Sequence, residues 1–107
     1  MHRGVFLDRS EAERTTFGEA LDRYAGEVTS GKRGWETEMY RINALKKHPL
    51  AARSMASLRG VDFAKYRDDR LKKCGPATVK RELVIISHVF NTARKDWSLP
   101  VENPIAN

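Results

Sequence analysis

Apolar residues recur at helical spacing in four stretches of the chain, and this pattern predicts an all-α fold. The first stretch opens at Thr16, which forms a capping-box sequence with Glu19 and so provides side-chain partners for the first free amides of a helix. Thr29-Ser30-Gly31 is expected to end this helix. Its apolar stripe contains Phe17, Leu21, Tyr24 and Val28.

A second helix is predicted to begin near Gly34 or Trp35. It should stop before Pro49, because the residue that precedes a proline is disfavoured in the helical region. Residues 50–59 predict only a short helical turn or a packed loop. The predicted stripe contains Trp35, Met39, Ile42 and Leu45, and the opposite face carries Arg41, Lys46 and Lys47.

A third helix is predicted from Val61 to Lys73, with Asp62 as its N-cap, and Cys74-Gly75 should end it. Its inward side chains are predicted to be Phe63, Tyr66 and Leu71. Local ion pairs are expected among Arg67, Asp68, Asp69 and Arg70.

The fourth helix has the clearest pattern. Gly75-Pro76 predicts its start, since a proline at the first helical position loses no hydrogen bond, and Leu99-Pro100 predicts its end. Ile85 and Val89 widen the stripe, as expected for a helix that packs against two neighbours. The stripe itself falls within an arc of about 80° and contains Val79, Leu83, Ile86, Phe90, Ala93 and Trp97.

Composition adds a functional indication. The 107 residues suffice for a single domain, and their formal charge of +6 suits a polyanionic partner, although a basic block is often only a solvated face. The basic excess begins at Lys32 and runs through His48. Cys74 is the single cysteine, and no Cys/His cluster has zinc spacing, so we expect neither a disulfide nor a metal or other cofactor. Without a membrane-spanning run or a signal-peptide core, we expect a cytoplasmic protein.

The polar side of the fourth helix carries the strongest candidate site. With Val79 at zero on a helical wheel, a continuous strip extends from about 60° to about 200°. The acidic residues Glu82 and Asp96 lie outside this strip, whereas the apolar Val84 lies inside it. Lys and Arg bind phosphates, and Asn and Arg also reach base edges, so the strip predicts contact with a duplex, aided by Thr78 at the helix start. This polar strip consists of Lys80, Arg81, Ser87, His88, Asn91, Arg94 and Lys95.

No catalytic arrangement is legible in the chain. His2 belongs to the N-terminal segment, where Val5-Phe6-Leu7 could form a short extended arm, and His48 is expected to cap carbonyls at a helix end. No Ser–His–Asp set, glycine-rich phosphate loop or metal-ligand spacing occurs. The aromatic residues of the apolar stripes are expected in the core.

Two segments give the chain a family resemblance. GPATVKREL at 75–83, followed by SHVFNTAR at 87–94 and Trp97, resembles the N-terminal core-binding domain of tyrosine recombinases of the phage-integrase type. YRDDRL at 66–71 matches the third helix of that family, and Asn103-Pro104 matches the dipeptide that precedes its catalytic domain. The resemblance covers roughly residues 15–105.

The resemblance implies a SAM-like bundle of four to five helices that clamps one face of a recombination site. In the family the second and fourth helices face double-stranded DNA, and other recombinase protomers are partners. The catalytic arginine, lysine, histidines and tyrosine lie in a later domain, so no catalytic residue transfers to this chain. We therefore expect an arm at 1–15, a non-catalytic DNA-binding domain at 16–99 and the start of a linker at 100–107. No small-molecule substrate and no membrane contact are expected.

Three alternatives stay open at this point. A helical protein–protein interaction module is the main one, since fold does not fix function. A helix-turn-helix regulator is disfavoured, because no short recognition helix follows a tight turn. An enzyme in its own right is the least favoured. The DNA-binding residues predicted from the pattern and the resemblance are Arg41, Lys46, Lys47, Thr78, Lys80, Arg81, Ser87, His88, Asn91 and Lys95.

Overall fold

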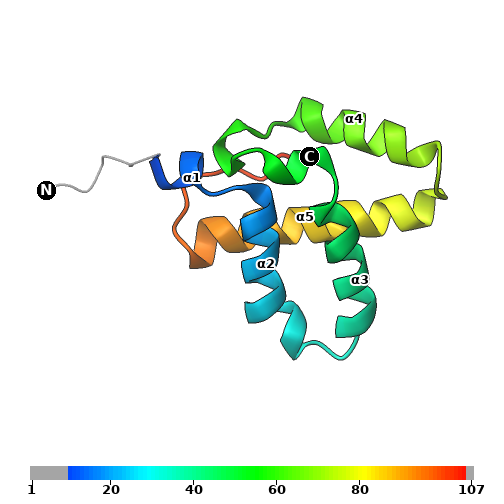
Figure 1. The fold of residues 1–107 in the computed structure, drawn as a ribbon, viewed down its shortest axis with the longest axis horizontal. Coiled ribbons are helices and arrows are strands. Elements are labelled where there is room, and N and C mark those ends of the chain that lie inside the picture. Colours follow the sequence, from blue (N-terminus) through cyan, green and yellow to red (C-terminus); the bar gives the residue numbers. More distant parts are fainter. Residues whose placement is uncertain (1–9, 106–107) are drawn as a thin grey trace, which may run out of the picture.

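The computed structural model describes residues 10–105, and over this range the chain is helical with no strand, as the sequence predicts. The long helix α5 lies beside α4, whereas α2 and α3 form a pair that runs across them (Figure 1). His2 and the arm expected at Val5–Leu7 lie outside the described residues. The α-helices are α1 (Ser10–Arg14), α2 (Phe17–Glu27), α3 (Trp35–Lys46), α4 (Gly60–Leu71) and α5 (Pro76–Asp96), and the 3-10 helices are η1 (Thr29–Gly31), η2 (Pro49–Ala52) and η3 (Met55–Ser57).

The start of α2 is fixed by the capping box that the sequence predicts. The Thr16 hydroxyl accepts from the Glu19 amide at 3.0 Å, and the Glu19 carboxylate accepts from the Thr16 amide at 2.9 Å. The short helix α1, which the pattern does not predict, packs against η3 and buries Ala12. The backbone of Thr16 also forms an isolated bridge with Ser54, so the entry to α2 is tied to the η2–η3 segment.

Three phenylalanines from three helices meet in the centre of the core. Phe17 of α2 lies 5.8 Å from both Phe63 of α4 and Phe90 of α5, and the two latter rings are 5.9 Å apart. All three side chains are buried. The two pairs that include Phe63 are edge-to-face, and such pairs add about 0.5–1.5 kcal/mol each beyond the area that they bury. This cluster therefore holds α2, α4 and α5 together.

Two apolar residues assigned to the core by periodicity are exposed. Trp35 is 47% exposed and Leu71 is 42% exposed, and each lies at the end of its helix, Trp35 at the start of α3 and Leu71 at the end of α4. Ile42 in the middle of α3 and Leu45 near its end are buried, as predicted. The segment 49–57, for which a short helical turn or a packed loop was expected, forms two 3-10 helices that bury Ala51 and Met55.

A buried carboxylate joins α4 to α5. Glu82 is 4% exposed and accepts hydrogen bonds from the Tyr66 hydroxyl at 2.7 Å and from the Arg70 guanidinium at 2.7 and 3.0 Å. Burial alone would raise the pKa of Glu82, but these hydrogen bonds outweigh it and hold the pKa below its ordinary value. Arg70 therefore pairs across the helix interface instead of with its neighbour Asp69, whereas the exposed pair Arg67–Asp68 forms locally as expected.

Asp62 and His48 each stabilise a helix start in a way that differs from the sequence prediction. Arg59 is the N-cap of α4, and Asp62 lies at its third position, where the carboxylate accepts from the Arg59 amide at 2.8 Å and pairs with Arg53 at 2.7 Å. His48 caps an amide and not a carbonyl, since its Nδ1 accepts from the Leu50 amide at 3.1 Å. That bond requires an unprotonated Nδ1.

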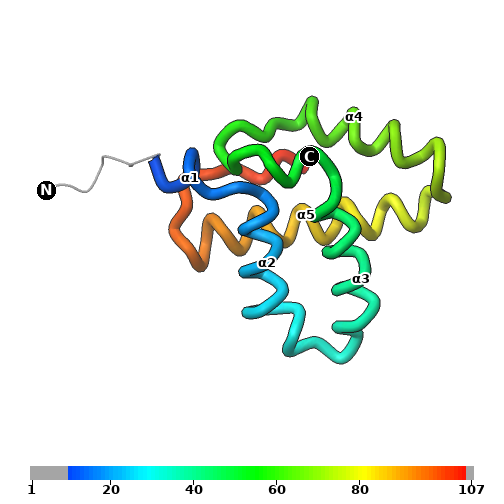
Figure 2. The backbone as a smooth tube through the Cα atoms, in the orientation of Figure 1, coloured from blue at the N-terminus to red at the C-terminus, as the bar shows by residue number. Residues whose placement is uncertain are grey.

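The chain reverses at the end of α5. The helix ends at Asp96, earlier than predicted, and Ser98 adopts a left-handed conformation with φ 58°. The indole of Trp97 donates to Glu27 at 2.9 Å and packs under the Arg23 guanidinium, which fixes this end of α5 to α2. Residues 98–105, here called the strap, then double back along α5 (Figure 2).

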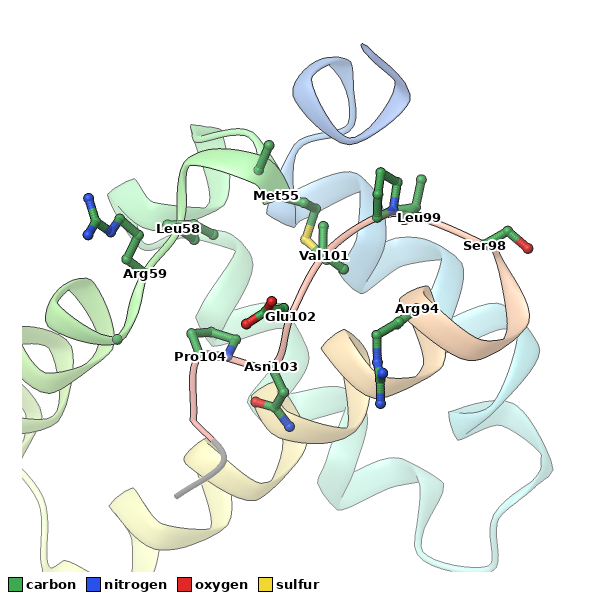
Figure 3. A pocket seen from close by; sticks show the side chains of 13 residues that line it. Met55, Leu58, Arg59, Arg94, Ser98, Leu99, Val101, Glu102, Asn103 and Pro104 are labelled. Atoms are coloured by element: carbon green, nitrogen blue, oxygen red, sulfur yellow. The ribbon is translucent and has the colours of Figure 1, made fainter. Parts of the chain in front are cut away.

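The strap was expected to be only the start of a linker, but its inner residues are packed. Leu99 and Val101 are buried, and Ile105 packs against the same core cluster. An open pocket of about 930 Å³ lies between the strap, η3 and the start of α4, and Met55, Leu58 and Val101 are among the residues that line it (Figure 3). Leu99, Val101 and Ile105 thus pack on the body of the chain, and the assignment of residues from 100 to a linker stays a prediction.

The Glu82 cluster predicts a large loss of stability for Glu82→Ala. The substitution leaves the Tyr66 hydroxyl and the Arg70 guanidinium without their partner, and we expect the free energy of unfolding to fall by about 2–3 kcal/mol. The loss is smaller than for a fully enclosed ion pair, because the Arg70 side chain is 28% exposed and regains water. Urea denaturation measures this change. Glu102→Ala, an exposed glutamate on the strap, is the matched control and should change stability by less than about 0.5 kcal/mol; equal effects of the two substitutions would contradict the role of Glu82.

His48 predicts a loss of stability in mild acid. Burial lowers the pKa of His48, with Asp69 opposing that shift and Arg70 and Lys73 adding to it. The unfolded chain therefore takes up the proton first, so the contribution of His48 is complete above about pH 7 and declines as the pH falls through 6.5, by at most about 1.4 kcal/mol per pH unit.

His48→Asn removes this titration and keeps an acceptor for the Leu50 amide. Urea denaturation between pH 5 and 8 should show the decline in the parent and a flatter profile in the variant. The exposed His88 serves as the control through His88→Asn, which should keep the slope of the parent. A parent profile that is flat in this range would show that His48 does not contribute.

Candidate nucleic-acid interface on helix α5

The cationic side chains of the polar strip are exposed along one side of α5. Lys80, Arg81, Arg94 and Lys95 are all exposed, as is His88. The apolar residues Ile86 and Phe90 on the other side are buried, which orients the helix. Val84, inside the strip, is 43% exposed, so the strip includes one apolar side chain in contact with water.

The four cations of α5 have no acidic partner among the described residues. Within residues 10–105, none of them forms an ion pair. By contrast, six other basic side chains each pair with a carboxylate, including Arg23 with Glu27 and Arg53 with Asp62. Because Glu82 is buried beneath α4, the strip itself contains no carboxylate that could neutralise it.

Two predicted contact residues in the middle of the strip are partly covered. Ser87 and Asn91 are half-buried because the strap lies across them. Asn103 of the strap donates through Nδ2 to Ser87 Oγ at 2.7 Å and to Asn91 Oδ1 at 3.2 Å. Sequence periodicity placed both residues on the polar side of the helix correctly, but it could not show that a later segment binds them.

Helix α3 contributes less positive charge to the candidate interface than its charge pattern indicated. Lys46 forms an ion pair with Asp22 of α2, and Arg41 is half-buried near Glu82, where its charge helps to lower the pKa of that carboxyl group. Lys47 is exposed and forms no ion pair within the described part of the chain. Thr78 is half-buried in the first turn of α5, and its side chain makes no capping hydrogen bond there.

A shallow hollow of about 320 Å³ between α2 and α5 brings Lys32 beside the strip. Lys32 Nζ donates to Glu38 at 3.0 Å and to the Tyr24 hydroxyl at 3.2 Å, and these bonds raise its pKa although burial acts to lower it. Lys32 begins the basic block of the sequence, but only the fold places it near His88 and Lys95. The other residues that line the hollow are Val28, Asn91, Thr92 and Asp96.

The described residues contain no group of His, Cys, Asp and Glu that could hold a metal ion. None of their helices is long and apolar enough to cross a membrane. The arrangement is thus an exposed set of hydrogen-bond donors and positive charges on a rigid helix, which is suited to contacts with phosphate oxygens.

Sequence comparison places the chain among known recombination proteins. It is 37% identical over 100 residues to a shufflon-specific DNA recombinase of Escherichia coli, in an alignment that covers 86% of this chain and 26% of that protein. Two putative integrase/recombinase proteins of Haemophilus influenzae are 35% and 29% identical over 96 and 91 residues, which cover 90% and 85% of this chain. No family model matches the chain, and no solved structure matches it significantly.

The matched region is a minor part of each relative. The chain spans 26–30% of the length of these three proteins. The matched segment includes most of the helical bundle, since each alignment covers at least 85% of the chain. The chain is therefore a relative of the integrase-type DNA recombinases over most of its length, in agreement with the resemblance of its sequence to the N-terminal core-binding domain of tyrosine recombinases.

Proposed function

We propose that this chain is a DNA-binding module of a site-specific recombinase and that the polar strip of α5 contacts the backbone of duplex DNA. The observation that supports the proposal most directly is the set of exposed cations without acidic partners, Lys80, Arg81, Arg94 and Lys95. An isolated positive face of this kind keeps its full charge for a polyanion, and each phosphate contact releases a condensed counterion.

The length of the strip fits a groove of B-DNA. Lys80 and Lys95 are separated by fifteen residues of helix, which is about 22 Å along the axis. The major groove is about 12 Å wide, so cations at the two ends of the strip reach phosphates on both of its sides. Lys47 on α3 extends the positive surface, whereas the pairing of Lys32 with Glu38 and of Lys46 with Asp22 reduces the contribution of these two lysines.

We also propose that recombination chemistry belongs to parts of the recombinase that this chain does not contain. The relatives are about three to four times longer than the matched region. Among the described residues, the hydroxyls that donate to a carboxylate, those of Tyr66 and Thr29, are buried and cannot attack DNA. In this proposal the module holds one face of the DNA, and other protomers hold the partner site. The division of the chain into an arm at 1–15, a binding domain at 16–99 and a linker from 100 remains a prediction.

A helical protein-interaction module is the second candidate function. It is favoured by two exposed aromatic side chains on α3, Trp35 and Tyr40, of which Tyr40 is 77% exposed. Such side chains are enriched in protein interfaces. The binding experiment below separates the two functions, because only the first requires the cations of α5.

The first prediction of the proposed function concerns salt dependence. If about four phosphates are neutralised, the logarithm of the DNA affinity should fall against the logarithm of salt concentration with a slope of about −3.6. Fluorescence anisotropy of one labelled duplex at several salt concentrations measures the slope. Lys80→Ala and Lys95→Ala should each flatten it by about 0.9, because each removes one phosphate contact.

Lys65→Ala is the matched control for these two substitutions. Lys65 is an exposed lysine of α4 outside the strip, and its replacement should leave the slope unchanged. All three changes are expected to leave folding intact. Folded Lys80 and Lys95 variants that bind with the slope of the parent would argue against DNA contact through α5 and favour the interaction module.

A second prediction concerns catalysis. The purified 107-residue chain should neither relax supercoiled plasmid nor form a covalent protein–DNA complex, since the hydroxyls that its described residues place beside a carboxylate, those of Tyr66 and Thr29, are buried. Agarose electrophoresis after incubation with plasmid, with and without protein denaturant, checks both. Relaxation that scales with protein concentration and disappears in a triple Tyr24→Phe, Tyr40→Phe, Tyr66→Phe variant would contradict the prediction.

A further inference from the structure

Asn103 of the strap is the residue that engages the neutral polar side chains of the strip. Its Nδ2 donates to Ser87 Oγ at 2.7 Å, to the Ser87 carbonyl at 3.3 Å and to Asn91 Oδ1 at 3.2 Å. The buried residues Leu99 and Val101 hold the strap in place beside α5 (Figure 3). The cations give the strip its charge, and this contact determines which hydrogen-bonding atoms of the strip can face DNA.

The orientation of the Asn103 amide follows from two backbone groups. Its Oδ1 accepts from the amide of Ile105 at 2.8 Å, so Nδ2 is the atom that faces α5, where the Ser87 carbonyl accepts from it. An amide nitrogen only donates. The atom of Asn91 that faces Asn103 must therefore be an acceptor, which is Oδ1, and the Nδ2 group of Asn91 is left for other partners.

The same contact determines what Ser87 offers. The Ser87 hydroxyl accepts from Asn103, so its own proton remains free to be donated. Together with the ammonium and guanidinium groups of α5, the Ser87 proton and the Asn91 Nδ2 group thus provide donors, while the oxygen of each residue is held toward Asn103. Phosphate oxygens accept only and suit such a surface, whereas asparagine reads adenine by accepting from N6 and donating to N7 at the same time.

We infer that Asn103 determines the base specificity of this module: by holding the acceptor oxygens of Ser87 and Asn91 toward the strap, it leaves their donors to face the DNA, and these donors bind the DNA backbone regardless of sequence. The inference rests on the proposed function, because it concerns how the same strip meets DNA. It makes Asn103 a specificity-determining residue that acts through Asn91.

Selection from a pool of random-sequence duplexes tests the inference. The parent chain should enrich no sequence, and Asn91→Ala should not change that result. Asn103→Ala frees Asn91 Oδ1, so the selected duplexes should favour adenine over each other base at one position by about fivefold or more, the discrimination expected of one bidentate contact. The double variant Asn103→Ala/Asn91→Ala should lose this enrichment.

A second variant should also make the Asn91 oxygen available to DNA, while the strap stays in place. The carboxylate of Asn103→Asp still accepts from the Ile105 amide, but its other oxygen only accepts, so the Asn91 amide should turn its nitrogen inward and its oxygen toward DNA. We expect adenine enrichment with a lower total affinity, because a negative charge is added. Circular dichroism and urea denaturation confirm that each variant is folded.

The outcomes separate this inference from the proposed function. Salt-dependent binding of the pool without enrichment by either folded Asn103 variant would overturn the inference and leave the proposed function standing. Enrichment by the parent that Asn91→Ala abolishes would also overturn it, since the acceptor of Asn91 would then already be available. Absence of salt-dependent binding would overturn the proposed function and the inference with it.

Discussion

The buried carboxylate of Glu82 is the constraint on which the arrangement of the long helix depends. A charge that is 4% exposed is stable only with partners, and Tyr66 and Arg70 of α4 provide them within 3.0 Å. These partners fix both the distance between α4 and α5 and the rotation of α5 about its axis. With that rotation set, Phe90 points into the aromatic core, and the cations of α5 point to solvent.

The same constraint explains why the candidate interface is electrostatically uniform. Glu82 neutralises Arg70 inside the bundle, so it is unavailable to the cations on the other side of the helix. Besides the charge of the interface, the strap restricts its hydrogen bonding, since Asn103 engages the acceptor oxygens of Ser87 and Asn91. In the proposed function, the charge of this surface attracts a polyanion, and the donors of Ser87 and Asn91 favour its phosphates over its base edges.

Sequence reasoning identified the cations of the site but not their surroundings. Helical periodicity placed Lys80 and Lys95 on the exposed side, because both faces of one helix follow from a 3.6-residue repeat. It could not find the pairing of Lys46 with Asp22 or the position of Lys32, which depend on how α2 lies against its neighbours. For the same reason, sequence reasoning used only the angle of Glu82 on the helical wheel and could not predict its partners on α4.

What the sequence by itself determined is local: the capping box at Thr16, the start of α5 at Pro76, the helical class and the polar strip all follow from interactions within a few residues. The tertiary structure decided which helix ends are covered, so that Trp35 is exposed although its spacing fits the core. It also decided that the strap folds back onto α5. That contact joins residues twelve and sixteen positions apart through one amide, and no periodic pattern encodes it, because it depends on the chain reversal at Ser98 and on the burial of Leu99 and Val101.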